Sequence, residues 1–166
     1  MPDHAILRPL TGHFKGDRHL FACRVYYEDT DLSGIVYHAN YLRFCERARS
    51  DMLRCVGIDQ RDAHEAGHGV YAVSEMQIKF VHPARLEDDL MVESRVMQIR
   101  AAAVFIHQRV MRTNADDSLH ELFRADVLAA FINPEGRPIR QPEQWVHAFR
   151  SVLSPHAIPD NQKKAE

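Results

Sequence analysis

The sequence predicts an α+β domain in which a curved, mostly antiparallel sheet of five strands wraps around one long helix. Residues 40–56 carry apolar side chains at three- and four-residue steps, which is typical of an amphipathic helix. Several other segments alternate apolar and polar residues with period two, as half-buried strands do. One helix and one such sheet can bury their apolar faces only against each other, so two layers are expected.

The size of the chain predicts a single domain. It has 166 residues, 45% of them hydrophobic, which suits one domain with a substantial core. Residues 1–19 mix Pro, Gly, His and basic residues without periodicity and are predicted to form a flexible N-terminal arm. The domain proper is expected at 20–153, and residues 154–166 form a polar C-terminal tail.

The first half of the domain contains one strand and the long helix. Residues 21–27 are rich in aromatic and β-branched residues and predict a strand, followed by an acidic loop that contains Gly34. The long helix follows; Asn40 or a residue just before it can cap the start, and Gly57 can stop it. Its polar side is expected to carry Arg43, Arg47, Asp51 and Arg54.

The second half is predicted to be mostly strands. A short helix near 59–66 precedes them, and a second amphipathic helix at 142–153 opens with proline near its first position. The outer face and the edges of such a sheet need cover, and a second copy of the chain is the simplest cover. A homodimer or homotetramer is therefore expected. The four later strands are predicted at 75–80, 90–99, 102–112 and 123–131.

Charge and cysteine content exclude several classes of function. Lys+Arg 21 against Asp+Glu 23 gives a net charge of −2 with no block of like charge, which argues against nucleic acid as a partner. No apolar run approaches the roughly 20 residues that span a bilayer, and residues 1–18 lack a secretion signal. Three cysteines without a C-x-x-C pair suggest neither disulfides nor a zinc knuckle, so a cytoplasmic protein is expected.

Residues 26–49 are the segment that carries candidate chemistry. A predicted strand delivers Glu28, Asp29 and Asp31, then a glycine turn, and six residues after that turn a helix begins. The N-terminus of a helix presents unpaired N–H groups and partial positive charge, so it can stabilise an oxyanion. A nearby carboxylate could act as nucleophile or general base, although carboxylates before a helix are also common caps and turn formers.

Residues 25–52 strongly resemble the hotdog-fold acyl-CoA thioesterases of the 4-hydroxybenzoyl-CoA thioesterase family, in particular the YbgC-like branch associated with the Tol-Pal cell-envelope system. The family pattern D-x-D-x-x-G-x-V falls on Asp29, Asp31, Gly34 and Val36. The resemblance implies that Asp31 is catalytic and that the backbone N–H of His38 stabilises the oxyanion. Residues implied to form the oxyanion site or position the substrate are Gly34, Val36, Tyr37 and Tyr41.

The same resemblance implies hydrolysis of an acyl thioester at the interface of a homodimer or homotetramer, without metal or redox cofactor. Relatives hold the CoA phosphates with basic residues at the start of the fourth strand, where this chain has Arg100 followed by three alanines. Lys79, Arg85 and Arg100 are therefore candidates for CoA binding. Contacts from Lys15 and Arg18, or an acyl carrier protein as donor, are alternatives.

Two other functions compete with thioester hydrolysis. His64, Glu65 and His68 spell the zinc-protease signature H-E-x-x-H, but glycines in and after it predict a helix too short to hold both histidines. A non-catalytic module that binds acyl groups or a carrier protein is the second alternative, since fold alone does not fix function. Acyl length, aromatic or aliphatic preference, and the nucleophile or base role of Asp31 stay open. Core positions, rather than an acyl tunnel, are predicted for Met52, Met76 and Phe80.

Overall fold

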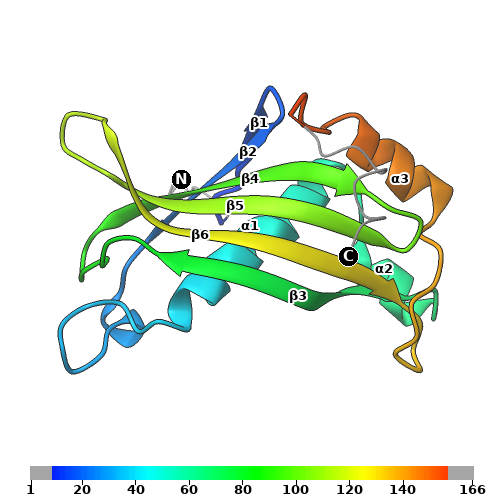
Figure 1. Cartoon of the computed structure of the whole chain (residues 1–166), viewed down its shortest axis with the longest axis horizontal. Coiled ribbons are helices and arrows are strands. Elements are labelled where there is room, and N and C mark those ends of the chain that lie inside the picture. Colours follow the sequence, from blue (N-terminus) through cyan, green and yellow to red (C-terminus); the bar gives the residue numbers. More distant parts are fainter. Residues whose placement is uncertain (1–8, 157–166) are drawn as a thin grey trace, which may run out of the picture.

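The computed structural model describes residues 9–156, which fold as one antiparallel sheet of six strands around a long helix (Figure 1). The strand order is β1-β2-β4-β5-β6-β3, so β1 and β3 are the two edges. The strands are β1 (His13–Lys15), β2 (Arg18–Arg24), β3 (Val70–Phe80), β4 (Asp89–Ile99), β5 (Ala103–Thr113) and β6 (Leu119–Ile132).

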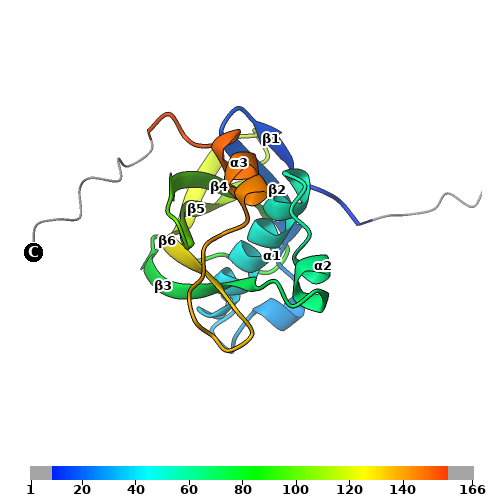
Figure 2. The same ribbon diagram turned by 90° about the vertical axis from the view of Figure 1, so that its right-hand side faces the viewer.

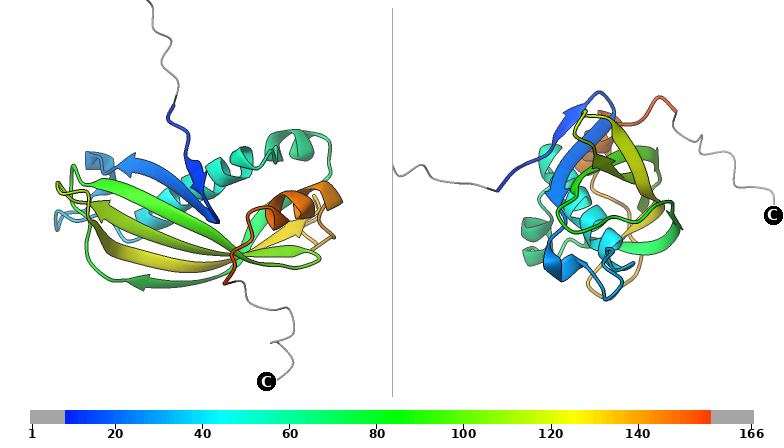
Figure 3. Two further views of the ribbon diagram at one scale, coloured as in Figure 1. Left: turned by 90° about the horizontal axis from the view of Figure 1, so that it is seen from above. Right: turned by 90° about the vertical axis from the view of Figure 1, so that its left-hand side faces the viewer.

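The long helix α1 (Asn40–Cys55) lies against the concave face of the sheet, and the sheet curls around it (Figures 2 and 3). A 3-10 turn, η1 (Tyr27–Asp29), precedes it, and α2 (Gln60–Glu65) and α3 (Glu143–Arg150) flank its C-terminal end. These elements confirm the predicted α+β architecture and the position of the long helix. The later strands lie near their predicted positions, except that β3 begins at Val70 rather than at residue 75. Among the described residues no helix is long and apolar enough to cross a membrane.

Two apolar clusters form the core, one at each end of α1. The first cluster surrounds Phe44 and Ala48 and joins the N-terminal half of α1 to the middle of the sheet. The second surrounds Met52 and adds the aromatic side chains of Phe131, Trp145 and Phe149. The helix α3 therefore covers the end of the sheet that lies beside the C-terminal end of α1. The helix therefore has an end closed by packing and an end where loops meet.

The prediction of five strands is wrong by one, because the N-terminal arm contributes β1. His13 pairs with Leu20 and Lys15 with Arg18 across a turn at Gly16, whose φ of 63° favours glycine. A three-residue strand is too short to show periodicity, so no sequence pattern predicted β1. Residues 13–19 are thus part of the sheet rather than a flexible arm, while residues 1–8 of that arm and 157–166 of the predicted tail lie outside the described residues.

The predicted polar side of α1 is also wrong at one position. Arg43, Arg47 and Arg54 are exposed as expected, but Asp51 is buried, with 1% of its surface accessible. Gly12, which precedes β1, and His19, on β2, cover this side of the helix. The backbone N–H of Gly12 donates to Asp51 Oδ2 over 2.8 Å. The apolar periodicity of the helix does not predict this burial, because the covering residue Gly12 lies 39 residues earlier in the chain.

Candidate active site

A cleft of about 450 Å³ opens where the N-terminal end of α1 meets the loops after β2 and after β3. We call it the Asp31 cleft. It brings together Asp31 and His38, the two residues predicted to be catalytic, with Val36 and Tyr41 of the predicted positioning set. Its complete lining is Asp31, Ile35, Val36, His38, Tyr41, Phe80, Val81, His82 and Pro83.

A tight hairpin in the loop before α1 places Asp31 at the cleft. The N–H of Asp31 donates to the carbonyl of Ile35 over 2.9 Å, and the N–H of Gly34 donates back to the carbonyl of Asp31 over 3.0 Å. Gly34 has a φ of 75°, a conformation that glycine adopts without strain, which explains why the turn has glycine there. Gly34 therefore shapes the loop and does not itself line the cleft.

Asp29 fixes this hairpin to the helix. Its buried carboxylate accepts the N–H of Tyr26 over 2.8 Å and the side-chain amide of Asn40 over 2.9 Å. Of Asp29 and Asp31, Asp29 is thus the carboxylate that stabilises the turn. Asn40 does not cap α1, contrary to one of the two predicted options, because it is the first residue of the helix and Ala39 occupies the N-cap position.

Asp31 itself is exposed and acidic. Its Oδ1 atom accepts hydrogen bonds from the Ser33 hydroxyl and, over 2.8 Å, from the Ser33 N–H, whereas no described residue donates to Oδ2. The Ser33 hydroxyl is the largest cause that lowers the pKa of Asp31, followed by the Ser33 N–H; the nearby His38 contributes less. The carboxylate is therefore ionised at neutral pH, with one oxygen oriented and the other free to react.

The N-terminal end of α1 is left without a side-chain cap. Ala39 occupies the N-cap position and forms no capping hydrogen bond, and the first turn holds no acidic residue. Among the described residues, the backbone N–H of His38 also has no partner. Unpaired N–H groups and the positive end of the helix dipole attract negative charge, so this end of the cleft can stabilise an oxyanion.

Tyr41 ties the opposite wall of the cleft to the helix. Its buried hydroxyl accepts the N–H of Ala84 over 2.9 Å, and the carbonyl of Ala84 accepts the N–H of Val36 over the same distance. Burial raises the pKa of Tyr41, so the hydroxyl stays protonated. These bonds hold the loop after β3 against the loop before α1, and the cleft lies between them.

The other predicted site residues lie outside the lining of the Asp31 cleft. Tyr37 is exposed, and the centroid of its ring lies 4.4 Å from that of the His38 ring, with the two planes tilted by 52°. Lys79 precedes Phe80 on β3, so alternation places it on the opposite face of the strand. Arg85 is exposed, and its backbone bridges to Ile35 at the rim of the cleft.

Arg100 lies at the far end of the sheet. It follows β4, which begins near the cleft and runs for 11 residues, or roughly 35 Å at about 3.3 Å per residue. Its guanidinium donates to Gln98 over 3.0 Å. Within one chain, therefore, Arg100 is not brought to the Asp31 cleft.

Three apolar residues were predicted to be core. Met52 is fully buried and Met76 packs against the first cluster, as expected. Phe80 is 48% exposed and lines the Asp31 cleft, so the core prediction is wrong for this residue. It is the last residue of β3, where the strand leaves the cover of α1, and its ring faces Tyr41 at 5.7 Å.

Sequence reasoning missed Ser33 and the cleft wall at 81–83. Ser33 had a readable signal, since a serine two residues after an aspartate commonly bonds to that carboxylate in a turn. Residues 81–83 lie in a stretch, 80–90, that shares the family resemblance, but no local pattern placed them at the site, because they reach the cleft only when the sheet forms. Glu46 accepts hydrogen bonds from Arg49 and Ser50 on the helix surface.

The structure separates the residues of the H-E-x-x-H motif. The helix α2 ends at Glu65, and Gly67 and Gly69 both have positive φ, so His68 lies beyond the helix. Within the described part of the chain, His64, Glu65 and His68 do not gather their ligand atoms in one group. This arrangement does not fit the two-histidine helical face of a zinc protease.

Comparison with known proteins points to one enzyme class. A sequence model of the thioesterase-like superfamily matches residues 25–164. The chain is 37% identical over 133 residues to the acyl-CoA thioesterase YbgC of Haemophilus influenzae, covering 80% of this chain and 94% of that protein. A probable thioesterase from Bartonella henselae, also 37% identical, superposes with a TM-score of 0.68 over 75% of this chain and 99% of that one.

A more distant solved structure supports the fold. The 4-hydroxybenzoyl-CoA thioesterase of Pseudomonas sp. strain CBS-3 is 23% identical and superposes with a TM-score of 0.71, over 79% of this chain and 98% of that one. At this identity the likeness concerns the fold alone. Together with the matched superfamily, it confirms the predicted hotdog fold.

Proposed function

Because the chain belongs to the thioesterase-like superfamily, we propose that the Asp31 cleft is its active site and that Asp31 is the catalytic carboxylate. The protein is an enzyme, an acyl-CoA thioester hydrolase, as its relatives at 33% to 38% identity are. One observation carries the role of Asp31. Asp31 and His38 line the same cleft, and the backbone N–H of His38 has no partner among the described residues.

The chemistry needs both groups. Asp31 either attacks the thioester carbonyl carbon, which breaks the C–S bond and leaves a mixed anhydride that water then cleaves, or it removes a proton from an attacking water. In both routes negative charge grows on the carbonyl oxygen, and the His38 N–H at the positive end of α1 stabilises it. Single turnover in ¹⁸O-labelled water separates the routes, because only the anhydride route can leave label in the Asp31 carboxylate.

Cations near the rim bind the CoA phosphates in this proposal. Arg85 is the best placed of the three candidates, since its backbone bridges to Ile35 of the cleft. Lys79 lies on the outward face of β3, and Arg100 could contribute only from another chain. An acyl carrier protein is the alternative donor, because a protein surface can replace contacts with the nucleotide.

A second copy of the chain completes the proposed assembly. The edge strand β3 is 11 residues long, and it pairs with β6 on one side only among the described residues. It exposes Val73 and Ile78, each more than 40% accessible, and a long apolar edge strand needs a partner. Light scattering should therefore find a dimer or tetramer at micromolar concentration, and a monomer would contradict this assembly.

The cytoplasm is the proposed location, where Cys23, Cys45 and Cys55 stay reduced, in keeping with the absence of disulfide bonds among them. The link to the Tol-Pal system stays a prediction from the family resemblance.

A thiol-release assay tests the proposed reaction. The wild type is measured on acyl-CoAs of increasing length and on benzoyl-type thioesters, beside the variant Asp31→Asn. Because general-base catalysis alone contributes about 10²–10⁴-fold, kcat should fall by at least that factor while the circular dichroism spectrum stays unchanged.

The chain offers a matched control at Asp116, an exposed aspartate in the turn between β5 and β6. Asp116 accepts the hydroxyl and the N–H of Ser118, as Asp31 does from Ser33, but lies outside the cleft. Asp116→Asn should leave kcat unchanged. Equal losses in both variants would contradict a catalytic role for Asp31, and a wild type that is silent on every CoA ester but active on acyl carrier protein would reassign the donor.

A further inference from the structure

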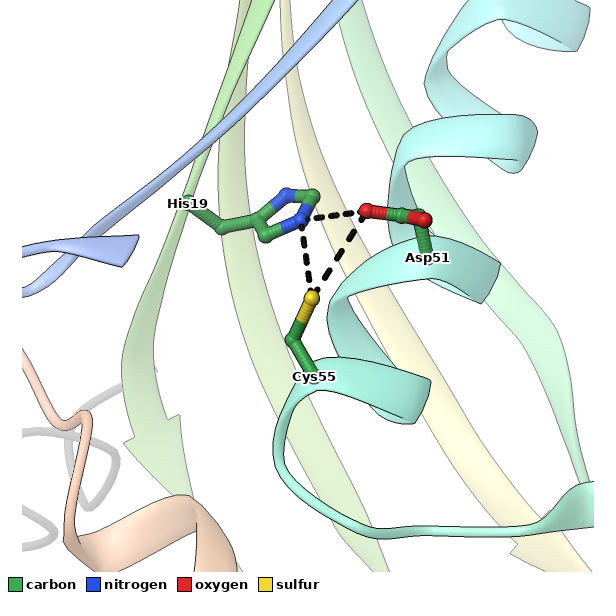
Figure 4. Close-up of side chains that lie close together, drawn as sticks. All are labelled: His19, Asp51 and Cys55. Atoms are coloured by element: carbon green, nitrogen blue, oxygen red, sulfur yellow. Dashed lines mark hydrogen bonds and ion pairs between the residues drawn. The ribbon is translucent and has the colours of Figure 1, made fainter. Parts of the chain in front are cut away.

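Three side chains with metal-binding donor atoms meet on the side of α1 that β2 covers, away from the Asp31 cleft (Figure 4). His19 extends from β2, and Asp51 and Cys55 extend from successive turns near the C-terminal end of α1. His19 Nε2 lies 2.9 Å from Asp51 Oδ2 and 3.8 Å from Cys55 Sγ, and Cys55 Sγ lies 3.7 Å from Asp51 Oδ2. All three donor atoms therefore point at one small volume.

The surroundings hold two of these donors rigidly. His19 and Asp51 are 0% and 1% exposed. Gly12 packs directly on them, because a Cβ at this position would lie 2.7 Å from Asp51 Oδ2 and 2.8 Å from His19 Nε2. Arg54 binds the other carboxylate oxygen, Oδ1, over 3.3 Å, which leaves Oδ2 turned towards the histidine.

Cys55, by contrast, is exposed and gives the cluster access to solvent. Its thiol has three weak contacts, with Gly12 O at 3.6 Å and with the two donor atoms described above. A sulfur that is held near a nitrogen and an oxygen donor, and that is open to water on its other side, can bind an ion without a change in the backbone.

The spacing fits tetrahedral coordination. With Zn–S of about 2.3 Å and Zn–N and Zn–O of about 2.0–2.1 Å, donors at tetrahedral angles lie roughly 3.3–3.6 Å apart. The observed separations of 2.9, 3.7 and 3.8 Å bracket that range. Imidazole, thiolate and carboxylate are also the donor types that zinc takes in proteins.

We propose that His19, Asp51 and Cys55 form a zinc site in which a water molecule occupies the fourth position on the solvent side. On binding, the Cys55 thiol releases its proton to solvent and the sulfur becomes a ligand. The ion joins β2 to the C-terminal end of α1, so its effect is on the stability of this end of the molecule. The Asp31 cleft lies at the other end of the helix.

Metal titration of the reduced, chelator-treated full chain tests the site. Zn²⁺ alone should bind at one ion per chain and raise Tm, since a ligand that binds only the folded state stabilises it. Co²⁺ in its place should give the intense absorption of a thiolate-to-cobalt charge transfer. That band is needed because the chain has 11 histidines, and sites made of histidines alone do not produce it.

Cys55→Ala removes one proposed ligand at an exposed position, where folding is not at risk. Loss of a residue that only hydrogen-bonds to a metal ligand already weakens metal binding about 10–100-fold. Loss of the thiolate ligand itself should therefore weaken zinc binding roughly 100-fold or more and abolish the cobalt band. Cys23→Ala is the matched control, because Cys23 lies on β2 outside the cluster and should keep both signals.

Asp51→Asn is the second variant; its amide oxygen can still accept the Gly12 N–H while the charge is lost, and binding should again weaken. If Asp51→Asn does not fold, Cys55→Ala decides the result. No stoichiometric zinc in the wild type, no thiolate band with cobalt, or zinc affinity unchanged in Cys55→Ala would each overturn the site.

Discussion

The two ends of α1 hold carboxylates in opposite environments. Near the N-terminal end, Asp31 is exposed, with one oxygen oriented by Ser33 and the other free. At the C-terminal end, Asp51 is buried and accepts bonds from the backbone N–H of Gly12 and the imidazole of His19. In our proposal the same chemical group therefore serves the reaction at one end, while at the other end it attaches β2 to the helix.

The difference comes from what packs on each end. Loops meet at the N-terminal end, and loops leave backbone groups and side chains open to a substrate. The C-terminal end is covered by β1, β2 and the aromatic cluster of α3. Stability should therefore depend mostly on the C-terminal end and activity on the N-terminal end, and three substitutions test this division.

The largest expected effect on stability is that of Phe149→Ala. Phe149 is 1% exposed and packs with Trp145 and Phe131 in the second cluster. Replacing a buried phenylalanine by alanine costs about 3–5 kcal/mol, because apolar burial is lost and a cavity remains. Urea denaturation should show this loss, while kcat per folded molecule stays unchanged.

Phe80→Ala is the matched control for that prediction. Phe80 is half exposed in the Asp31 cleft, so its loss should change KM and cost far less stability. The division between the two ends would be wrong if Phe149→Ala lowered kcat as strongly as it lowers stability, or if Phe80→Ala were equally destabilising.

Tyr41→Phe should lower both stability and activity, because Tyr41 lies at the N-terminal end of α1 and holds the cleft wall. It removes the hydroxyl that accepts the N–H of Ala84, and a buried donor left without a partner costs about 1–3 kcal/mol. The wall at 81–83 precedes Ala84, so kcat/KM should fall together with the free energy of unfolding. Denaturation and steady-state kinetics on one preparation measure both, and a fall in stability with unchanged kcat/KM would show that this bond does not hold the cleft wall.

The smallest expected effect is a shift of the pH profile in Ser33→Ala. The Ser33 hydroxyl is the largest cause that lowers the pKa of Asp31 below the usual value of 3.8. Asp31 must be ionised to act, so the wild type should lose activity through this group only below that pH. Without the hydroxyl the pKa rises, and the acid limb of kcat/KM should move to higher pH.

Ser118→Ala is the control for that shift, because Ser118 gives Asp116 the same two bonds outside the cleft and lowers its pKa in the same way. Its pH profile should match that of the wild type. An acid limb that stays in place in Ser33→Ala would mean that Asp31 does not set it.

Local pattern was enough to locate the long helix, most of the later strands and the segment that lines the Asp31 cleft. The apolar steps from Tyr41 to Leu53 bury the predicted face of α1, and the carboxylates after β2 lie beside the start of that helix as expected. These features depend on residues close in sequence, whose side-chain directions follow from helix and strand geometry alone. These local features therefore do not depend on which distant segments pack against them.

Contacts between distant residues decided the rest. One long amphipathic helix, a mostly antiparallel sheet and a pair of aspartates before the helix follow from local sequence patterns. The burial of Asp51, the place of Phe80 in the cleft and the extra strand at residues 13–15 depend on how the whole chain packs. Exposure depends on which segments cover a residue, and these segments come from elsewhere in the chain, as Gly12 does for Asp51.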